Sequence, residues 1–138
     1  MRNTRLSITH IVPTLILSTA LLGGCAVGGD KPMAMGHPTE VKTLDGVLAG
    51  TNGMTLYTFD KDVANSGKSA CNGPCATNWP PLMAQSTPTA AGYSVITRAD
   101  GQKQIAYKGK PLYYWIKDKQ PGDKTGDGFN GVWHAATP

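Results

Sequence analysis

Cys71 and Cys75 are the residues of the chain whose spacing most clearly indicates chemistry. The run Asn72-Gly73-Pro74 separates Cys71 from Cys75, so the backbone can fold back and bring the two sulfurs within bonding distance. In an oxidising compartment the expected product is a disulfide, whose short loop adds about 2 kcal/mol of stability on the chain-entropy model. A free dithiol that binds metal or exchanges electrons is the alternative, but the strand-then-helix context of such pairs is absent.

The histidines bear on metal binding. His134 is the only histidine from residue 39 onward, because His10 and His37 precede that point. It could join Cys71 and Cys75 in the copper site of a periplasmic metal-handling or redox protein. A strand residue with a satisfied hydrogen bond is the simpler interpretation of His134. One histidine is too few for multi-histidine metal catalysis in this part of the chain.

Hard oxygen ligands gather in two glycine-containing stretches. They are Asp60, Asp62 and Asn65 in the first stretch and Asp118, Asp123, Asp127 and Asn130 in the second. Such groups could bind calcium, although neither stretch has the spacing of an EF-hand loop. Asp62 and Asp118 also have a simpler interpretation, in which each carboxylate accepts backbone N–H bonds and shapes the turn after a strand.

The remaining residues do not indicate an enzyme. The chain has no Gly-x-Ser-x-Gly elbow, no His-Glu-x-x-His helix and no phosphate-binding loop, so we expect no catalytic residues and no cofactor. Without Arg2 and Arg5, the 13 basic residues fall to 11 against nine acidic ones, a net charge of +2. Because the lysines alternate with aspartates, as in Lys117-Asp118-Lys119, nucleic-acid binding has little electrostatic support.

Residues 1–24 are typical of a bacterial export signal. A basic start is followed by an apolar run that is too short to span a bilayer and that contains Pro13. The run ends in Leu22-Gly23-Gly24-Cys25, which resembles the bacterial lipobox. The resemblance implies that residues 1–24 are removed and that Cys25 is lipidated.

Residues 25–38 are expected to be the lipidated cysteine and a flexible linker, because this stretch is rich in glycine and proline. Two or three acyl chains would hold the protein stably in a membrane. Ala26 stands where inner-membrane lipoproteins often carry Asp, so the resemblance favours the outer membrane, facing the periplasm. An alternative role for this segment is copper binding by Met33, Met35 and His37.

Residues 39–138 are expected to form one all-β domain, a small antiparallel β-sandwich or barrel-like fold. Helical periodicity is absent, and glycine and proline recur every few positions. The predicted strands are 41–44, 47–48, 55–59, 93–97, 104–107, 112–116 and 132–135. Turns are expected between most of them, at Asp45-Gly46, Asn52-Gly53, Asp100-Gly101 and Lys108-Gly109. Of these, Asn52-Gly53 and Asp100-Gly101 suit type I′ hairpin turns.

The domain contains two related repeats, about 39–82 and 93–138. The segment 56–62 reappears 56 positions later as 112–118. The repeat-motif residues are Tyr57, Phe59, Asp62 and Trp79 in the first copy and Tyr113, Trp115, Asp118 and Trp133 in the second. Alternation along a strand puts the rings of each copy on one face, so we expect them to pack the core across an internal pseudo-symmetry. A stacking platform for a ring-shaped ligand is the alternative.

The same residues resemble a known family. Tyr57-x-Phe59-x-x-Asp62 and Tyr113-x-Trp115-x-x-Asp118 fit the Y-x-[FWY]-x-x-D pattern of a family of predicted bacterial lipoproteins, also called the secreted repeat of unknown function. Cys75-x-x-x-Trp79-Pro80-Pro81-Leu82 and Gly131-Val132-Trp133-His134 also match, in the expected order. The resemblance implies a lipid-anchored or secreted two-repeat domain and carries over no activity.

The expected function is that of a lipid-anchored, non-catalytic binding or envelope-associated module of the bacterial cell envelope. Its lipid anchor contacts the membrane, and its partner, a protein or a small ligand, is not identified by the sequence. Loops carry binding residues more often than strands do, so the loops 60–79 and 117–130 are the expected binding surface.

Overall fold

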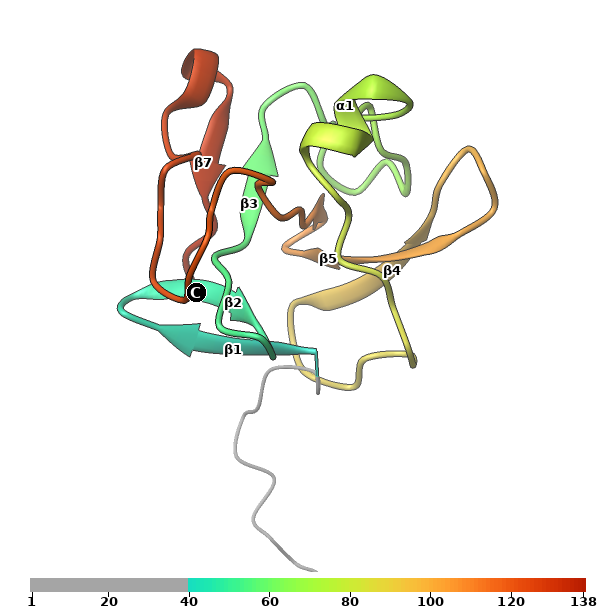
Figure 1. Cartoon of the computed structure of the whole chain (residues 1–138). Helices are drawn as coiled ribbons and strands as arrows, with labels where there is room; N and C mark the ends of the chain where they lie inside the picture. The colour runs from blue at the N-terminus through green and yellow to red at the C-terminus, as the bar shows by residue number, and fades with distance from the viewer. Residues whose placement is uncertain (1–39) are drawn as a thin grey trace, which may run out of the picture. The chain divides into compact units, whose positions relative to one another are not determined.

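Antiparallel strands form most of the regular structure in residues 40–138, which are the residues that the computed structural model describes (Figure 1). The strands are β1 (Val41–Leu44), β2 (Val47–Gly50), β3 (Tyr57–Phe59), β4 (Tyr93–Thr97), β5 (Lys103–Tyr107), β6 (Lys110–Pro111) and β7 (Trp133–Ala135). Strand β1 pairs with β2, β3 pairs with β7, and β5 lies between β4 and β6. Every one of these pairings is antiparallel, which confirms the predicted all-β class.

Several predicted features lie outside the described residues. They are the signal peptide 1–24, the lipidated Cys25 and the linker that follows it, with Met33, Met35 and His37. No helix among residues 40–138 is long and apolar enough to cross a membrane.

Two hairpins form at Asp45-Gly46 and at Lys108-Gly109, where the sequence predicts turns. Asp45 and Gly46 connect β1 to β2 with φ values of 49° and 80°, and Lys108 and Gly109 connect β5 to β6 with 47° and 79°. Positive φ at both positions is the mark of a type I′ turn. Asn52-Gly53 and Asp100-Gly101 also connect antiparallel segments, as predicted. The predicted type I′ geometry was wrong at both, because in each pair only the glycine has a positive φ.

Two short helices and one interrupted strand also depart from the sequence prediction. Helix α1 (Pro74–Asn78) begins with proline, whose missing N–H costs nothing in a first helical turn. A 3-10 turn, η1, spans Phe129–Gly131. In the predicted strand 112–116, only Tyr113 forms bridges, one to each of two neighbouring segments, so the strand is wrong as a continuous ladder.

Each repeat is hydrogen-bonded to the last residues of the other repeat, which we call its closing segment. In the first half, the N–H of Leu48 donates to the carbonyl of Ala136 at 2.7 Å, and Ala136 belongs to the second repeat. In the second half, the N–H of Ile105 donates to the carbonyl of Leu82 at 2.9 Å, and Leu82 belongs to the first repeat. The two halves therefore exchange equivalent segments and cannot separate without breaking both sets of bonds.

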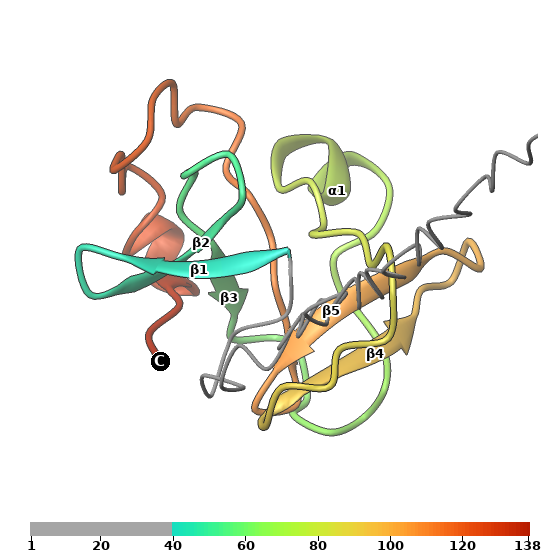
Figure 2. The same cartoon turned by 90° about the horizontal axis from the view of Figure 1, so that it is seen from below.

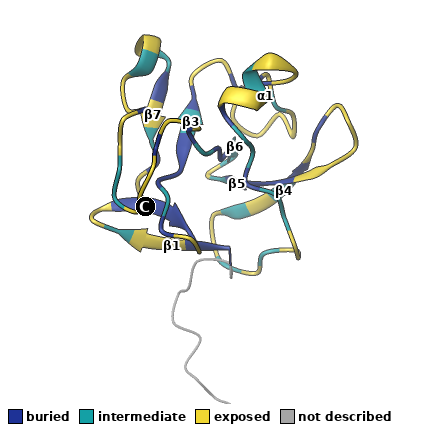
Figure 3. Ribbon diagram, in the orientation of Figure 1, coloured by how far each residue is buried: buried dark blue, intermediate teal, exposed yellow. Residues whose placement is uncertain are grey.

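The interior divides into an aliphatic and an aromatic cluster. The aliphatic cluster contains Val41, Leu48, Leu56, Leu82, Ile105, Leu112 and Ala136. The aromatic cluster contains Tyr57, Phe59, Cys71, Trp79, Tyr113, Trp115 and Trp133. Strands β3, β5 and β6 are largely buried, whereas much of α1 and the loop tips are exposed (Figure 3). Viewed from below, β3 lies behind the β1–β2 hairpin, and the β4–β5 pair lies to one side of it (Figure 2).

Candidate functional site

The repeat-motif tryptophans stack on one another in the core. The rings of Trp79 and Trp133, which hold equivalent places in the two repeats, are parallel to within 4° with centroids 3.7 Å apart. Trp115 stacks on Trp79 at 4.0 Å, and Phe59 stacks on Trp133 at 4.2 Å. All four side chains are buried. Their faces contact each other, so they pack the core and leave no platform for a ring-shaped ligand.

The motif tyrosines and aspartates pair crosswise between the repeats. The Tyr57 hydroxyl of the first repeat donates to Asp118 Oδ2 of the second at 2.6 Å. The Tyr113 hydroxyl of the second repeat donates to Asp62 Oδ2 of the first at 2.7 Å. All four residues are buried. The motif therefore fastens one repeat to the other.

The second oxygen of each buried carboxylate holds a loop in place. Asp62 Oδ1 accepts the N–H of Ala70 at 2.6 Å, and Asp118 Oδ1 accepts the N–H of Thr125 at 3.0 Å. Burial raises the pKa of Asp62, and the hydrogen bonds from Ala70 and Tyr113 oppose that rise. Each carboxylate shapes the loop after its strand, and neither has an oxygen left free for calcium.

A buried arginine organises the disulfide loop, and nothing in the sequence pattern pointed to it. Arg98 donates to Gln104 Oε1 at 2.7 Å, to the carbonyl of Cys71 at 2.7 Å and to Ser69 Oγ at 3.1 Å. Ser69 Oγ in turn lies 2.6 Å from the Tyr113 hydroxyl. The guanidinium thus joins the β4–β5 hairpin to the loop that contains the cysteines.

The two cysteines form the expected disulfide, with a Cα–Cα distance of 5.2 Å. Cys71 is completely buried, and Cys75 packs against the aromatic cluster. Among residues 40–138, no three His, Cys, Asp or Glu side chains come together to hold a metal ion. His134 therefore does not join Cys71 and Cys75, and the two aspartate-rich stretches do not form a calcium cage.

His134 lies instead in an open groove. Its Nε2 is 2.8 Å from Asp60 Oδ2, and both side chains are partly exposed, at 47% and 44%. The groove has a volume of about 380 Å³ and is lined by Thr58, Tyr107, Lys108, Lys110, His134, Ala135, Ala136 and Thr137. We call it the His134 groove. It runs between the β3–β7 pair and the turn from β5 to β6, so both repeats contribute to it.

Comparison with known families settles what kind of domain this is. The model of the family described as a secreted repeat of unknown function matches residues 39–83 and again residues 94–137. The chain belongs to this family of secreted lipoproteins. The recognition made from the repeat motif is thereby confirmed, with two copies of the repeat. Neither a curated protein nor a solved structure matches the chain.

In the described part of the chain, residues 40–138, the motif residues that the two secreted repeats share mainly stabilise the fold. The rings of the motif fill the aromatic cluster, and its tyrosines and aspartates make the crossed hydrogen bonds. Among the described residues singled out from the sequence, His134 lines an open groove. Lys108 and Lys110, which stand beside it, were missed, because isolated lysines carry no pattern that separates a binding residue from a solvated one.

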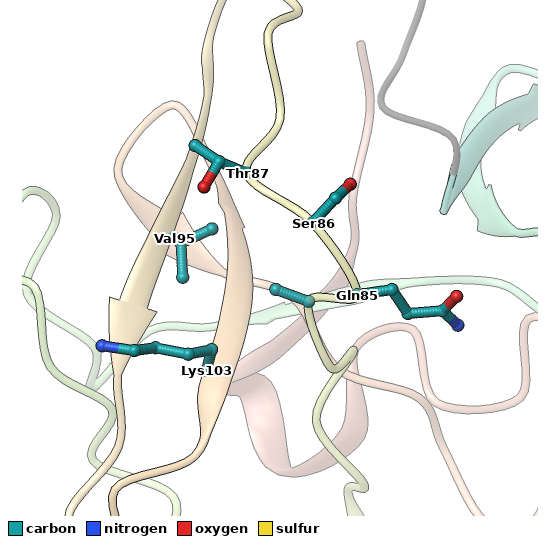
Figure 4. Close-up of a pocket in the computed structure, with 6 residues that line it drawn as sticks. Gln85, Ser86, Thr87, Val95 and Lys103 are labelled. Carbon is teal, nitrogen blue, oxygen red and sulfur yellow. The ribbon is translucent and has the colours of Figure 1, made fainter.

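A second groove of the secreted-repeat domain lies beside β4 and the start of β5 and lacks converging polar groups. It is lined by Ala84, Gln85, Ser86, Thr87, Val95 and Lys103. In Figure 4 the amide of Gln85 points away from Val95 and Lys103. The N–H of Gln85 and the hydroxyl of Ser86 both donate to Oε1 of the buried Glu40. The polar groups of this segment therefore hold the chain together, and the His134 groove is the better candidate.

Proposed function

We propose that the protein is a lipid-anchored module of the bacterial cell envelope that binds a partner through the His134 groove and catalyses no reaction. The lipobox at Leu22-Gly23-Gly24-Cys25 and membership of a secreted lipoprotein family support the anchor. With two or three acyl chains at about 0.8 kcal/mol per buried CH₂, the protein would stay on its membrane. Ala26 favours the outer membrane, with the domain facing the periplasm.

The observation that carries this proposal is that the charged groups of the interior are hydrogen-bonded, whereas the lysines of the groove are not paired with a described carboxylate. In the interior, Asp62, Asp118 and Arg98 each make several hydrogen bonds to neighbouring groups. In the groove, Lys108 and Lys110 make no ion pair with another of the described residues, 40–138. Concave sites with a few converging polar groups are the usual location for ligands. The interior supports the fold, and the groove is the surface open to a partner.

The surroundings of His134 support binding over catalysis. A catalytic histidine needs a nucleophile or a substrate proton within hydrogen-bond reach, and Asp60 is the only described residue with which His134 forms a side-chain hydrogen bond. The hydroxyl of Ser69 is already engaged with Tyr113 and Arg98. We therefore assign His134 a role in contacting the ligand.

Photo-crosslinking in intact cells tests this proposal. A photoreactive amino acid replaces Thr137, an exposed residue of the His134 groove, in the full-length protein. Thr87, an exposed threonine of the second groove, is the matched control position. We expect a discrete adduct with an envelope component from position 137 and none from position 87. Equal adducts from both positions, or none from position 137, would contradict the proposal.

A further inference from the structure

We infer that the His134 groove binds a phosphate group, carried either by a soluble envelope molecule or by a lipid headgroup. This inference rests on the function proposed above and adds the chemical class of the ligand. Lys108 and Lys110 flank a single glycine, and His134 reaches the same groove from β7. Two ammonium groups and an imidazole therefore converge on one cavity from two separate elements.

The donors in the groove suit a phosphate group. Lysine binds phosphate as a point charge, and Lys108 and Lys110 both line the groove. The hydroxyls of Thr58 and Thr137 add further donors. A phosphate monoester presents three strong acceptor oxygens, enough to engage several of these groups together.

The backbone at Lys108 gives independent support. Four non-glycine residues between 40 and 138 have positive φ, and three of them are Asp45, Asn65 and Asn130, whose types tolerate that conformation. The fourth is Lys108, with φ of 47°. Asn, Asp or Gly is the usual residue at this position of a type I′ turn. Lysine there is locally unfavourable, and strained positions cluster at functional sites.

The turn that carries Lys108 is held rigidly from both sides. The N–H of Lys108 donates to the carbonyl of Gly92 at 2.7 Å, and the N–H of Asn65 donates to the carbonyl of Gly109 at 3.0 Å. Gly109 packs so closely on Asn65 that a Cβ at this position would collide with the Asn65 side-chain oxygen. The ammonium of Lys108 rests 5.0 Å from the ring centre of Tyr107. The charge is thus presented by a preorganised turn, which lowers the entropic cost of binding.

Two carboxylates lie near these cations, and neither forms an ion pair with a lysine. Asp60 is paired with His134 at 2.8 Å. Asp62 is hydrogen-bonded to Tyr113 and to Ala70; burial raises its pKa, and the charge of Lys110 is among the smaller influences that oppose this rise. No described carboxylate lies within ion-pair distance of either lysine ammonium. Asp62 therefore offsets part of the charge of Lys110, and Lys108 keeps its charge for an anion.

The test uses the full-length, lipidated protein in dodecyl maltoside micelles, which contain no phosphate. Inorganic phosphate is titrated at constant ionic strength while the amide resonances of His134 and Ala135 are followed by NMR. A second set of micelles contains phosphatidic acid, whose headgroup is a phosphate monoester, and receives no added inorganic phosphate. We expect saturable shifts from at least one source. Shifts with inorganic phosphate identify a soluble ligand, and shifts with phosphatidic acid identify a headgroup.

The lysine variants make the test specific. Lys108→Gln and Lys110→Gln should each weaken binding about fivefold, which is the effect of losing one partly exposed charge. Lys103→Gln removes a lysine from the opposite end of β5 and should leave binding unchanged. Lys108→Asn should weaken binding as Gln does while raising the melting temperature, which separates loss of the ligand contact from misfolding.

Two outcomes overturn the inference. One is the absence of any saturable shift from either phosphate source, and the other is equal binding by Lys108→Gln and Lys103→Gln. A specific cross-link at position 137 without a response to phosphate would contradict the phosphate inference alone and would still support the proposed binding function. Loss of the cross-link would refute the proposed function itself.

Discussion

Removing the hydroxyl of Tyr113 or of Tyr57 should destabilise the domain far more than a typical Tyr→Phe substitution. Tyr113→Phe leaves Asp62 Oδ2 buried without the bond that it now receives at 2.7 Å, and it removes the contact to Ser69 Oγ at 2.6 Å. Tyr57→Phe takes away the bond of 2.6 Å to Asp118 Oδ2. A buried, charge-assisted hydrogen bond contributes about 2–3 kcal/mol, counting the partner left unsatisfied.

For a domain of this size, that loss lowers the melting temperature by about 10–20 °C. The assay is urea and thermal unfolding of the full-length protein, followed by tryptophan fluorescence. Tyr114→Phe is the control, because the Tyr114 hydroxyl is partly buried and makes no hydrogen bond to another described residue. It should cost less than about 1 kcal/mol. If Tyr57→Phe and Tyr113→Phe cost no more than this control, the crossed pairs do not fasten the two repeats.

Three further predictions follow from single residues. Burial raises the folded-state pKa of Asp62, so its contribution to stability is complete below the unfolded value of about 4 and is lost as the pH rises through the folded value. In urea titrations across that window, the free energy of unfolding should fall with rising pH in the wild type, and this component should vanish in Asp62→Asn. Gly126→Ala would place a Cβ 2.8 Å from the Trp79 ring, so it should cost about 1–3 kcal/mol and shift the tryptophan emission; an unchanged spectrum would contradict the tight packing. Lys108→Asn should stabilise the domain by about 0.5–1 kcal/mol in thermal unfolding by relieving an unfavourable φ, and a loss of stability would argue against strain at this turn.

The features that depend on local pattern could be predicted from the sequence. The spacing of Tyr57 and Phe59 indicated a strand with a buried aromatic face, and both side chains are buried in β3. The turn-forming residues between Cys71 and Cys75 indicated a disulfide. Antiparallel pairing followed from short strands separated by turn residues, because such connections are too short for parallel crossovers.

Features that depend on long-range pairing could not be predicted. Asp62 was expected to bond to the backbone after its strand, and it does so, but its bond to Tyr113 joins residues 51 positions apart. Arg98 is buried among groups that approach it only in the folded chain, and no periodicity marks a lone arginine as an interior residue. The exchange of closing segments between the repeats is likewise a property of the whole domain.

The turn at Lys108 shows that residue propensity also fails to predict the type of a turn. Propensity favoured Asn52-Gly53 as a type I′ turn over Lys108-Gly109, because asparagine tolerates positive φ and lysine does not. The structure has the opposite arrangement. Conflicts between local preference and the observed backbone are expected at functional sites, and this one became visible only in the folded chain.

Hydrogen–deuterium exchange of the full-length protein, compared between intact envelopes and purified micelles, tests the central claim most directly. If the His134 groove is the binding surface, the envelope should slow exchange at the turn 107–111 and along β7, relative to micelles. Exchange in the crossed motif segments, 57–62 and 113–118, should be the same in both settings. Protection confined to the loops 60–79 and 117–130 would place the partner elsewhere and contradict the account.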